Sequence, residues 1–130
     1  MSPARILLVD DEPRLLRIVA MYLELEGFEV LCATDGEAAL VLLATADFDL
    51  AILDVMLPGQ DGIEVCQRVR SNPRTRMLPV LMFTALSSDV EVERARQAGA
   101  THLITKPYNL PGLGSLVKQT LLAPLPAAIV

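Results

Sequence analysis

Five polar residues of this 130-residue chain directly follow short, mainly apolar runs, and their types together suit one kind of chemistry. Asp10 and Asp11 follow the run ILLV, Asp54 follows LAIL, Thr84 follows VLMF, and Lys106 follows HLIT. A carboxylate can bind a divalent cation or attack phosphorus, while a hydroxyl and an ammonium group can hold phosphoryl oxygens. These residue types therefore predict phosphoryl transfer to a carboxylate.

A cluster of Asp10, Asp11 and Asp54 is unfavourable unless a cation compensates its charge. Two carboxylates about 4 Å apart repel by about 4 kcal/mol at an effective dielectric constant near 20. Mg²⁺ prefers oxygen ligands and typically binds one or two carboxylates together with water and a phosphate oxygen. We therefore expect Mg²⁺ as the cofactor, with one carboxylate left to act as the nucleophile.

Each of these residues also has a simple structural explanation when it is taken alone. Asp10 or Asp11 could cap a helix, Asp54 could belong to a loop, Thr84 could cap the next segment, and Lys106 could be a solvated surface charge. Their joint placement at the ends of successive apolar runs favours the functional interpretation.

The apolar runs that precede these residues predict five strands, over residues 5–9, 29–33, 50–53, 79–83 and 102–105. Three of the runs (ILLV, LAIL and VLMF) show no alternation of apolar and polar residues. Such runs are typical of parallel strands that are covered by helices on both faces of the sheet.

Apolar residues at helical spacing follow each predicted strand. The first helix is expected to begin at Pro13, which suits a first-turn position, and to end before Gly27. One face of this helix is traced by Leu15, Ile18, Val19, Tyr22 and Leu23.

The other helices are marked by their caps and by a fifth apolar face. The second is expected over 36–46, and capping boxes at Asp61 with Glu64 and at Ser88 with Glu91 should open the third and fourth. Gly99 should end the fourth helix. The apolar face of the fifth contains Leu110, Leu113, Val117 and Leu121.

Strands that alternate with single helices predict a (βα)5 doubly wound, five-stranded parallel sheet with the flavodoxin-like strand order 2-1-3-4-5. Sheets of this kind place their sites beyond the carboxyl ends of the strands, which is where the polar residues stand. We expect one domain over 1–122, followed by an apolar, proline-containing tail or linker over 123–130.

Composition and charge exclude several other classes of protein. A chain that is 52% hydrophobic and 21% charged is globular and not disordered. A net charge of −5 argues against unaided binding to nucleic acid. There is neither a signal-peptide core nor a stretch near the roughly 20 apolar residues of a membrane span, so a cytoplasmic location is expected. Cys32 and Cys66 stand far apart, and both should be buried, reduced thiols.

In its motifs the chain resembles the receiver domains of two-component response regulators, including the chemotaxis regulators. The matching motifs are VDDEP (9–13), LDVMLPGQDG (53–62), FTA (83–85), AGA (98–100) and TKP (105–107). The likeness extends from about residue 5 to residue 122.

The resemblance implies a role for each residue of the predicted site. Asp54 would be the phosphoacceptor, Asp11 a direct Mg²⁺ ligand, and Asp10 a ligand acting largely through bound water. The backbone carbonyl of Met56 would complete the protein ligands. Thr84 and Lys106 would hold the phosphoryl group, and the Lys106–Pro107 peptide bond is usually cis in the family. The donor would be a phosphohistidine on a sensor histidine kinase or a phosphotransfer protein, while the downstream effector is not specified.

The chain also departs from the family pattern. Leu103 occupies the position, three residues before the lysine, that is usually aromatic and reports phosphorylation. Thr101 and His102 occupy two positions that are often acidic, so the salt-bridge network through which some regulators dimerise is not expected. Gly112 and Gly114 weaken the fifth helix by up to about 1 kcal/mol each.

Three alternative functions would place different requirements on the sequence. A phosphatase with an aspartyl-phosphate intermediate would need a DxDx[TV] loop, and this motif does not follow the first predicted strand. A flavin or nucleotide binder would need a Ser/Thr/Gly-rich first loop or a GxxxxGK[ST] motif, and neither occurs. A receiver-like interaction module that signals without phosphate stays open as the alternative function.

Overall fold

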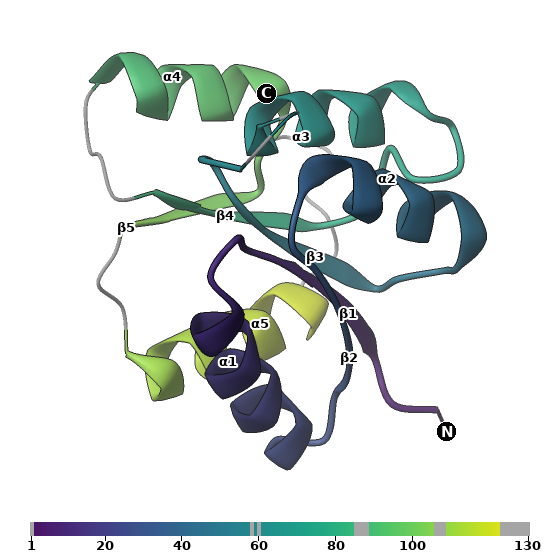
Figure 1. The fold of residues 1–130 in the computed structure, drawn as a ribbon, viewed down its shortest axis with the longest axis vertical. Helices are drawn as coiled ribbons and strands as arrows, with labels where there is room; N and C mark the ends of the chain where they lie inside the picture. The colour runs from purple at the N-terminus through teal and green to yellow at the C-terminus, as the bar shows by residue number, and fades with distance from the viewer. Residues whose placement is uncertain (1, 58, 60, 85–88, 106–108, 123–130) are drawn as a thin grey trace.

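A parallel five-stranded sheet forms the centre of the protein, whose computed structural model describes residues 2–57, 59, 61–84, 89–105 and 109–122 (Figure 1). Its strands are β1 (Arg5–Val9), β2 (Glu29–Ala33), β3 (Leu50–Asp54), β4 (Val80–Thr84) and β5 (His102–Thr105). They are ordered β2-β1-β3-β4-β5 across the sheet. The predicted doubly wound sheet and its strand order are confirmed.

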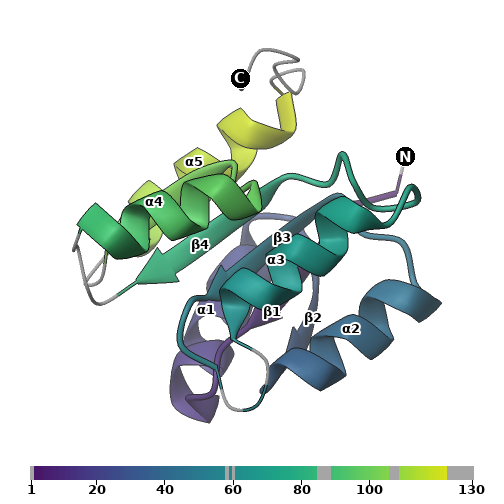
Figure 2. The same ribbon diagram turned by 90° about the horizontal axis from the view of Figure 1, so that it is seen from above.

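Helices cover both faces of the sheet, which explains why the strands lack alternation. The helices α1 (Pro13–Leu25) and α5 (Leu110–Leu122) lie on one face (Figure 1). The helices α2 (Gly36–Thr45), α3 (Gly62–Ser71) and α4 (Asp89–Ala98) lie on the other (Figure 2). The central strand, β3, is therefore buried at all five of its positions.

Successive side chains of a strand point to opposite faces of the sheet, so the strands feed two separate apolar cores. The core under α1 and α5 contains the strand residues Ile6, Leu8, Leu50, Ile52, Leu81 and Phe83. The core under α2, α3 and α4 contains the strand residues Leu7, Val9, Ala33, Ala51, Leu53, Val80 and Met82. Because both cores are filled, the sheet is a rigid base for the loops at its carboxyl edge.

Most of the predicted helix ends are confirmed by their local geometry. Pro13 is the first residue of α1, and the Asp61 carboxylate accepts a hydrogen bond of 2.9 Å from the Glu64 N–H at the start of α3. Gly27 and Gly99 follow α1 and α4 with φ of +99°, a backbone conformation that favours glycine. The remaining predicted cap, Ser88, lies outside the described residues.

Two strands differ from their predicted bounds by one residue. β3 includes Asp54, and the ladder continues beyond it because the Val55 N–H donates to the Phe83 carbonyl at 2.8 Å. β4 begins at Val80 and not at Pro79, since proline has no N–H to donate to the ladder, and it ends with Thr84. The second helix ends at residue 45 and not at 46.

One residue of the predicted helical face is exposed, and the predicted burial of Cys32 was wrong. Ile18 is 53% exposed, because the buried face of α1 is centred on Leu16, Val19 and Leu23. Cys32 is exposed, because β2 is an edge strand of the sheet. Cys66 is buried as predicted, and neither cysteine forms a disulfide.

The fifth helix forms despite its glycines because local contacts support its first turns. The Asn109 side chain accepts a hydrogen bond of 2.6 Å from the Gly112 N–H. A β-carbon at Gly114 would lie 3.0 Å from the ring of Tyr22, so the small residue lets α1 and α5 approach closely. Lys118 of α5 and Glu26, the C-cap residue of α1, form an ion pair of 2.9 Å.

The described part of the chain contains no helix that is both long and apolar enough to cross a membrane. The last helix of the described residues, α5, ends at Leu122. The predicted tail, 123–130, lies outside the described residues.

Candidate functional site

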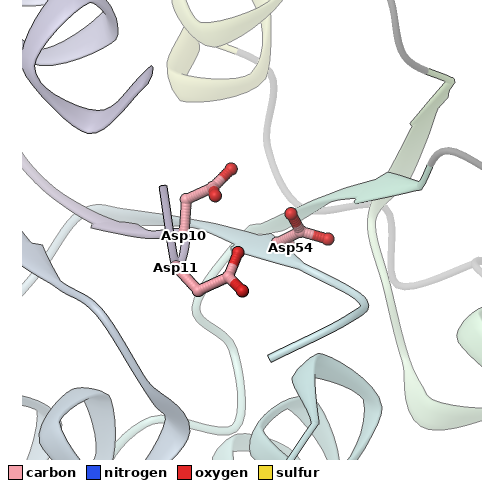
Figure 3. Close-up of side chains that lie close together, drawn as sticks. All are labelled: Asp10, Asp11 and Asp54. Carbon is pink, nitrogen blue, oxygen red and sulfur yellow. The ribbon is translucent and has the colours of Figure 1, made fainter. Parts of the chain in front are cut away.

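Three aspartates meet at the carboxyl edge of the sheet, as the sequence predicts. β1 and β3 are parallel neighbours with Val9 opposite Leu53, so Asp10 and Asp54 are the next residues of the two strands. One carboxylate oxygen from each of Asp10, Asp11 and Asp54 lies within 4.8 Å of the others. Figure 3 shows the three side chains around one space at the ends of these strands.

The burial of the three carboxylates is unequal. Asp10 is only 2% exposed and Asp54 only 6% exposed, whereas Asp11 is exposed to solvent. The site is therefore open on the side of Asp11 and closed beneath Asp10 and Asp54.

Backbone contacts hold Asp10 at the junction of β1 and α1. Its N–H donates to the Ala33 carbonyl at 3.2 Å, which continues the pairing of β1 with β2. Its carboxylate accepts a hydrogen bond of 3.0 Å from the Glu12 N–H. Asp10 is not the helix cap considered above, because the N-cap of α1 is Glu12 and makes no side-chain cap bond. The bond from Glu12 instead fixes the direction of the Asp10 carboxylate.

Asp54 is fixed from two directions. Its Oδ1 accepts a hydrogen bond of 3.0 Å from the Met56 N–H. Behind it, the first residue of α3, Gly62, donates its N–H to the Val55 carbonyl at 2.9 Å. A β-carbon at Gly62 would lie 2.1 Å from the Asp54 carbonyl oxygen, so only glycine allows α3 to lie this close to the end of β3.

Met56, the predicted carbonyl ligand, follows Asp54 by two residues. Its side chain is 63% exposed and its N–H is bonded to the Asp54 carboxylate. The side chain points away from the apolar cores, so any contribution of Met56 to a metal site comes from its backbone.

Thr84 ends β4 and is completely buried. Residues 83 and 54 are paired in the β3–β4 ladder, which places Thr84 one residue beyond Asp54 on the neighbouring strand. The Thr84 hydroxyl donates a hydrogen bond of 3.3 Å to the Glu91 carboxylate of α4. The last predicted site residue, Lys106, lies outside the described residues together with Pro107.

Glu91 is a site neighbour that the sequence predicted only as the capping partner of Ser88. It stands in the first turn of α4, seven residues after Thr84, and it is partly buried. The sequence gives only a weak indication of this contact. Glu91 is an acidic residue in the first turn of the helix that follows β4, and such a residue lies near the carboxyl end of the preceding strand.

The ligand atoms of this cluster are all oxygens, which decides the class of metal that fits. Hard cations such as Mg²⁺ and Ca²⁺ select carboxylate and carbonyl oxygens, whereas Zn²⁺ and copper favour imidazole and thiolate. The residues present therefore fit Mg²⁺.

Comparison with known proteins agrees with the fold. A family model described as the response regulator receiver domain matches residues 6–118. A CheY-like response regulator receiver domain protein from Methanospirillum hungatei JF-1 is 31% identical, with a TM-score of 0.87 over 92% of this chain and 94% of that one. The chemotaxis response regulator CheY4 of Vibrio cholerae is 33% identical, with a TM-score of 0.86 over 93% and 100%.

A third solved structure shares the fold at lower identity. It is the receiver domain of the sensor histidine kinase PA1611 from Pseudomonas aeruginosa PAO1, with a magnesium ion coordinated in its active-site cleft. It is 24% identical, with a TM-score of 0.87 over 94% of this chain and 100% of that one.

Proposed function

This chain belongs to the response regulator receiver domain family, and on that premise we propose that Asp54 is the residue that accepts the phosphoryl group. Receiver domains are the phosphoacceptor signalling domains of two-component systems. The observation that carries the assignment is the position of Asp54, nearly buried at the end of the central strand beside Asp10 and Asp11.

The proposed reaction uses the Asp54 carboxylate as the nucleophile. A carboxylate oxygen forms a bond to phosphorus while the bond from phosphorus to the donor imidazole nitrogen breaks, and that nitrogen keeps the electron pair. The Met56 N–H holds the Asp54 carboxylate by its 3.0 Å hydrogen bond, which supports a fixed direction of attack. The domain thus assists its own phosphorylation. The same site assists its own dephosphorylation.

The protein ligands of the proposed metal site are Asp10, Asp11, Asp54 and the backbone carbonyl of Met56. Bound Mg²⁺ would neutralise the clustered carboxylates and the charge on the transferring phosphoryl oxygens. Asp11 is the exposed member of the cluster and is proposed as a direct ligand. Asp10, whose carboxylate is already bonded to the Glu12 N–H, is proposed to act largely through bound water.

Thr84 and Lys106 are proposed to hold the phosphoryl oxygens. The support for Thr84 is its place at the end of β4, next to Asp54 in the sheet. The support for Lys106 is the TKP motif of the family, which the chain carries at 105–107.

The proposed phosphodonor is a phosphohistidine on a sensor histidine kinase or on a phosphotransfer protein. The signal would pass to a downstream effector by a change in the surface of the domain. The net charge of −5 supports a protein partner and not direct binding to nucleic acid, and we propose a cytoplasmic location. The receiver domain is proposed to occupy 1–122, with 123–130 as a tail or linker.

Intact-mass measurement tests this function directly. Incubation with acetyl phosphate and Mg²⁺ should add one phosphoryl group to the wild type and none to Asp54→Asn. A wild type that stays unmodified would favour the alternative, a receiver-like module that signals without phosphate. Equal modification of the variant would place the phosphoacceptor elsewhere.

A further inference from the structure

The buried Thr84 hydroxyl connects the candidate site to the helix α4. It donates a hydrogen bond of 3.3 Å to Oε1 of Glu91, seven residues further along the chain. Thr84 is completely buried, and Glu91 is partly buried in the first turn of α4. A contact between a buried strand end and a helix start is able to pass a change at one to the other.

The pleat of β4 determines which helix Thr84 faces. Alternate residues of a strand point to the same face of the sheet, so Thr84 shares a face with Met82 and Val80. Both of these residues pack in the core under α2, α3 and α4, to which α4 contributes Ala95 and Ala98. The Thr84 side chain is therefore directed towards the α4 side of the sheet, where Glu91 accepts its hydrogen bond.

The hydroxyl of threonine has one proton, whereas an ionised carboxylate only accepts hydrogen bonds. Thr84 cannot donate fully to Glu91 and to a phosphoryl oxygen on Asp54 at the same time. Thr84 and Asp54 end adjacent strands, so the phosphoryl group and Glu91 compete for the same donor from different sides.

We propose that Glu91 is a positioning residue that holds the Thr84 hydroxyl in the unphosphorylated state and opposes phosphoryl binding. This inference rests on the proposed function of Asp54 and Thr84. When the phosphoryl group binds, Thr84 transfers its hydrogen bond to it, and the start of α4 loses a contact with the sheet. A ligand shifts an equilibrium only through contacts that differ between two states, and this hydrogen bond is such a contact.

Beryllofluoride, a mimic of the phosphoryl group, provides the probe. Glu91→Ala should bind beryllofluoride with Mg²⁺ roughly 2-fold to 10-fold more tightly than the wild type, which corresponds to the loss of one competing hydrogen bond. Alanine is the best helix former, so the variant keeps the start of α4. Glu93→Ala is the matched control, since it removes a carboxylate from the same helix whose ion-pair partner is the exposed Arg96.

A double-mutant cycle separates the hydrogen bond from general electrostatics. In a Thr84→Val background there is no hydroxyl to release, so Glu91→Ala should leave the affinity for beryllofluoride unchanged. An equal gain in both backgrounds, or a gain of the same size in Glu93→Ala, would show that charge alone is responsible and would overturn the inference.

The outcome for the wild type distinguishes this inference from the function on which it rests. A wild type that binds no beryllofluoride overturns the proposed function and the inference with it. A wild type that binds, together with a folded Glu91→Ala variant of the same affinity, overturns the role of Glu91 alone. Amide spectra of each variant without beryllofluoride establish that it is folded.

Discussion

Gly62 lies so close to Asp54 that a β-carbon on residue 62 would stand 2.1 Å from the Asp54 carbonyl oxygen. The contact is with backbone, which cannot turn aside, so any larger residue must displace either α3 or the end of β3. The position of the proposed phosphoacceptor thus depends on the absence of a side chain on the first residue of the next helix.

Gly62→Ala should therefore lower both stability and the rate of phosphorylation. We expect a loss of about 2–4 kcal/mol in the free energy of unfolding, as for overpacking against rigid surroundings. Urea unfolding and the rate of mass gain with acetyl phosphate measure the two effects. Gly112→Ala is the control, because its new β-carbon would meet only the end of the Asn109 side chain. Equal effects of the two variants would contradict a special role for Gly62.

Mg²⁺ should stabilise the folded protein, because folding gathers Asp10, Asp11 and Asp54 while the unfolded chain disperses them. Linkage predicts about 2.7 kcal/mol when free Mg²⁺ exceeds its dissociation constant a hundredfold. Thermal melts with and without Mg²⁺ measure the shift, which Asp11→Ala should reduce strongly. Asp47→Ala should keep the full shift, because Asp47 is 91% exposed and lies before the start of β3, at the other edge of the sheet. A thermal unfolding midpoint of the wild type that does not change with Mg²⁺ would exclude the proposed Mg²⁺ site.

The sheet and the convergence of the aspartates could be predicted because both follow from local patterns. The runs ILLV, LAIL and VLMF have no polar face, so they require helices on both sides and hence parallel strands. Parallel strands end at one edge, and this alone brings Asp10 and Asp54 together. The structure confirms that the carboxylates of Asp10 and Asp54 lie together at this edge.

Details that depend on how elements pack could not be predicted. Ile18 matches a helical face in the sequence, but it is exposed because α1 turns Leu16, Val19 and Leu23 towards the sheet. The hydrogen bond from Thr84 to Glu91 depends on the rotation of α4, which the spacing of its residues does not set. The same is true of the approach of Gly62 to Asp54.

The buried thiol of Cys66 should make the protein less stable at alkaline pH. Burial raises the pKa of Cys66 from 9.0 to about 11, because the thiolate loses its water, while the nearby Arg70 acts weakly in the opposite direction. The unfolded chain releases this proton first, so the stabilising effect is complete below pH 9 and is lost as the pH rises towards 11. The loss should be about 2–3 kcal/mol.

Urea unfolding of the wild type and of Cys66→Ala between pH 8 and 11 isolates this contribution, since tyrosines and lysines titrate in both proteins. The variant starts less stable, because it loses buried volume, but its stability should fall less steeply with pH. Parallel curves for the two proteins would show that Cys66 has no part in the alkaline loss.

Leu103 should be largely passive when the domain is phosphorylated. It stands opposite Met82 in the β4–β5 ladder and packs, half-buried, against the core under α2, α3 and α4. An apolar side chain that keeps these contacts in both states cannot bias the equilibrium between them. We therefore expect the change to pass through the segment 85–88, which lies outside the described residues, and through the start of α4.

Leu103→Ala tests this expectation, because it removes the side chain that stands where the family usually has an aromatic residue. The free energy of unfolding should fall by about 1–2 kcal/mol, at or below the lower end of the range for a fully buried leucine, since the side chain is only half-buried. The changes that beryllofluoride causes in the amide spectrum of residues 89–99 should nevertheless persist. Thr84→Val, which removes the hydroxyl, should lose them. If Leu103→Ala loses these changes while it stays folded and still binds beryllofluoride, then Leu103 transmits the signal and the route through Thr84 and Glu91 is insufficient.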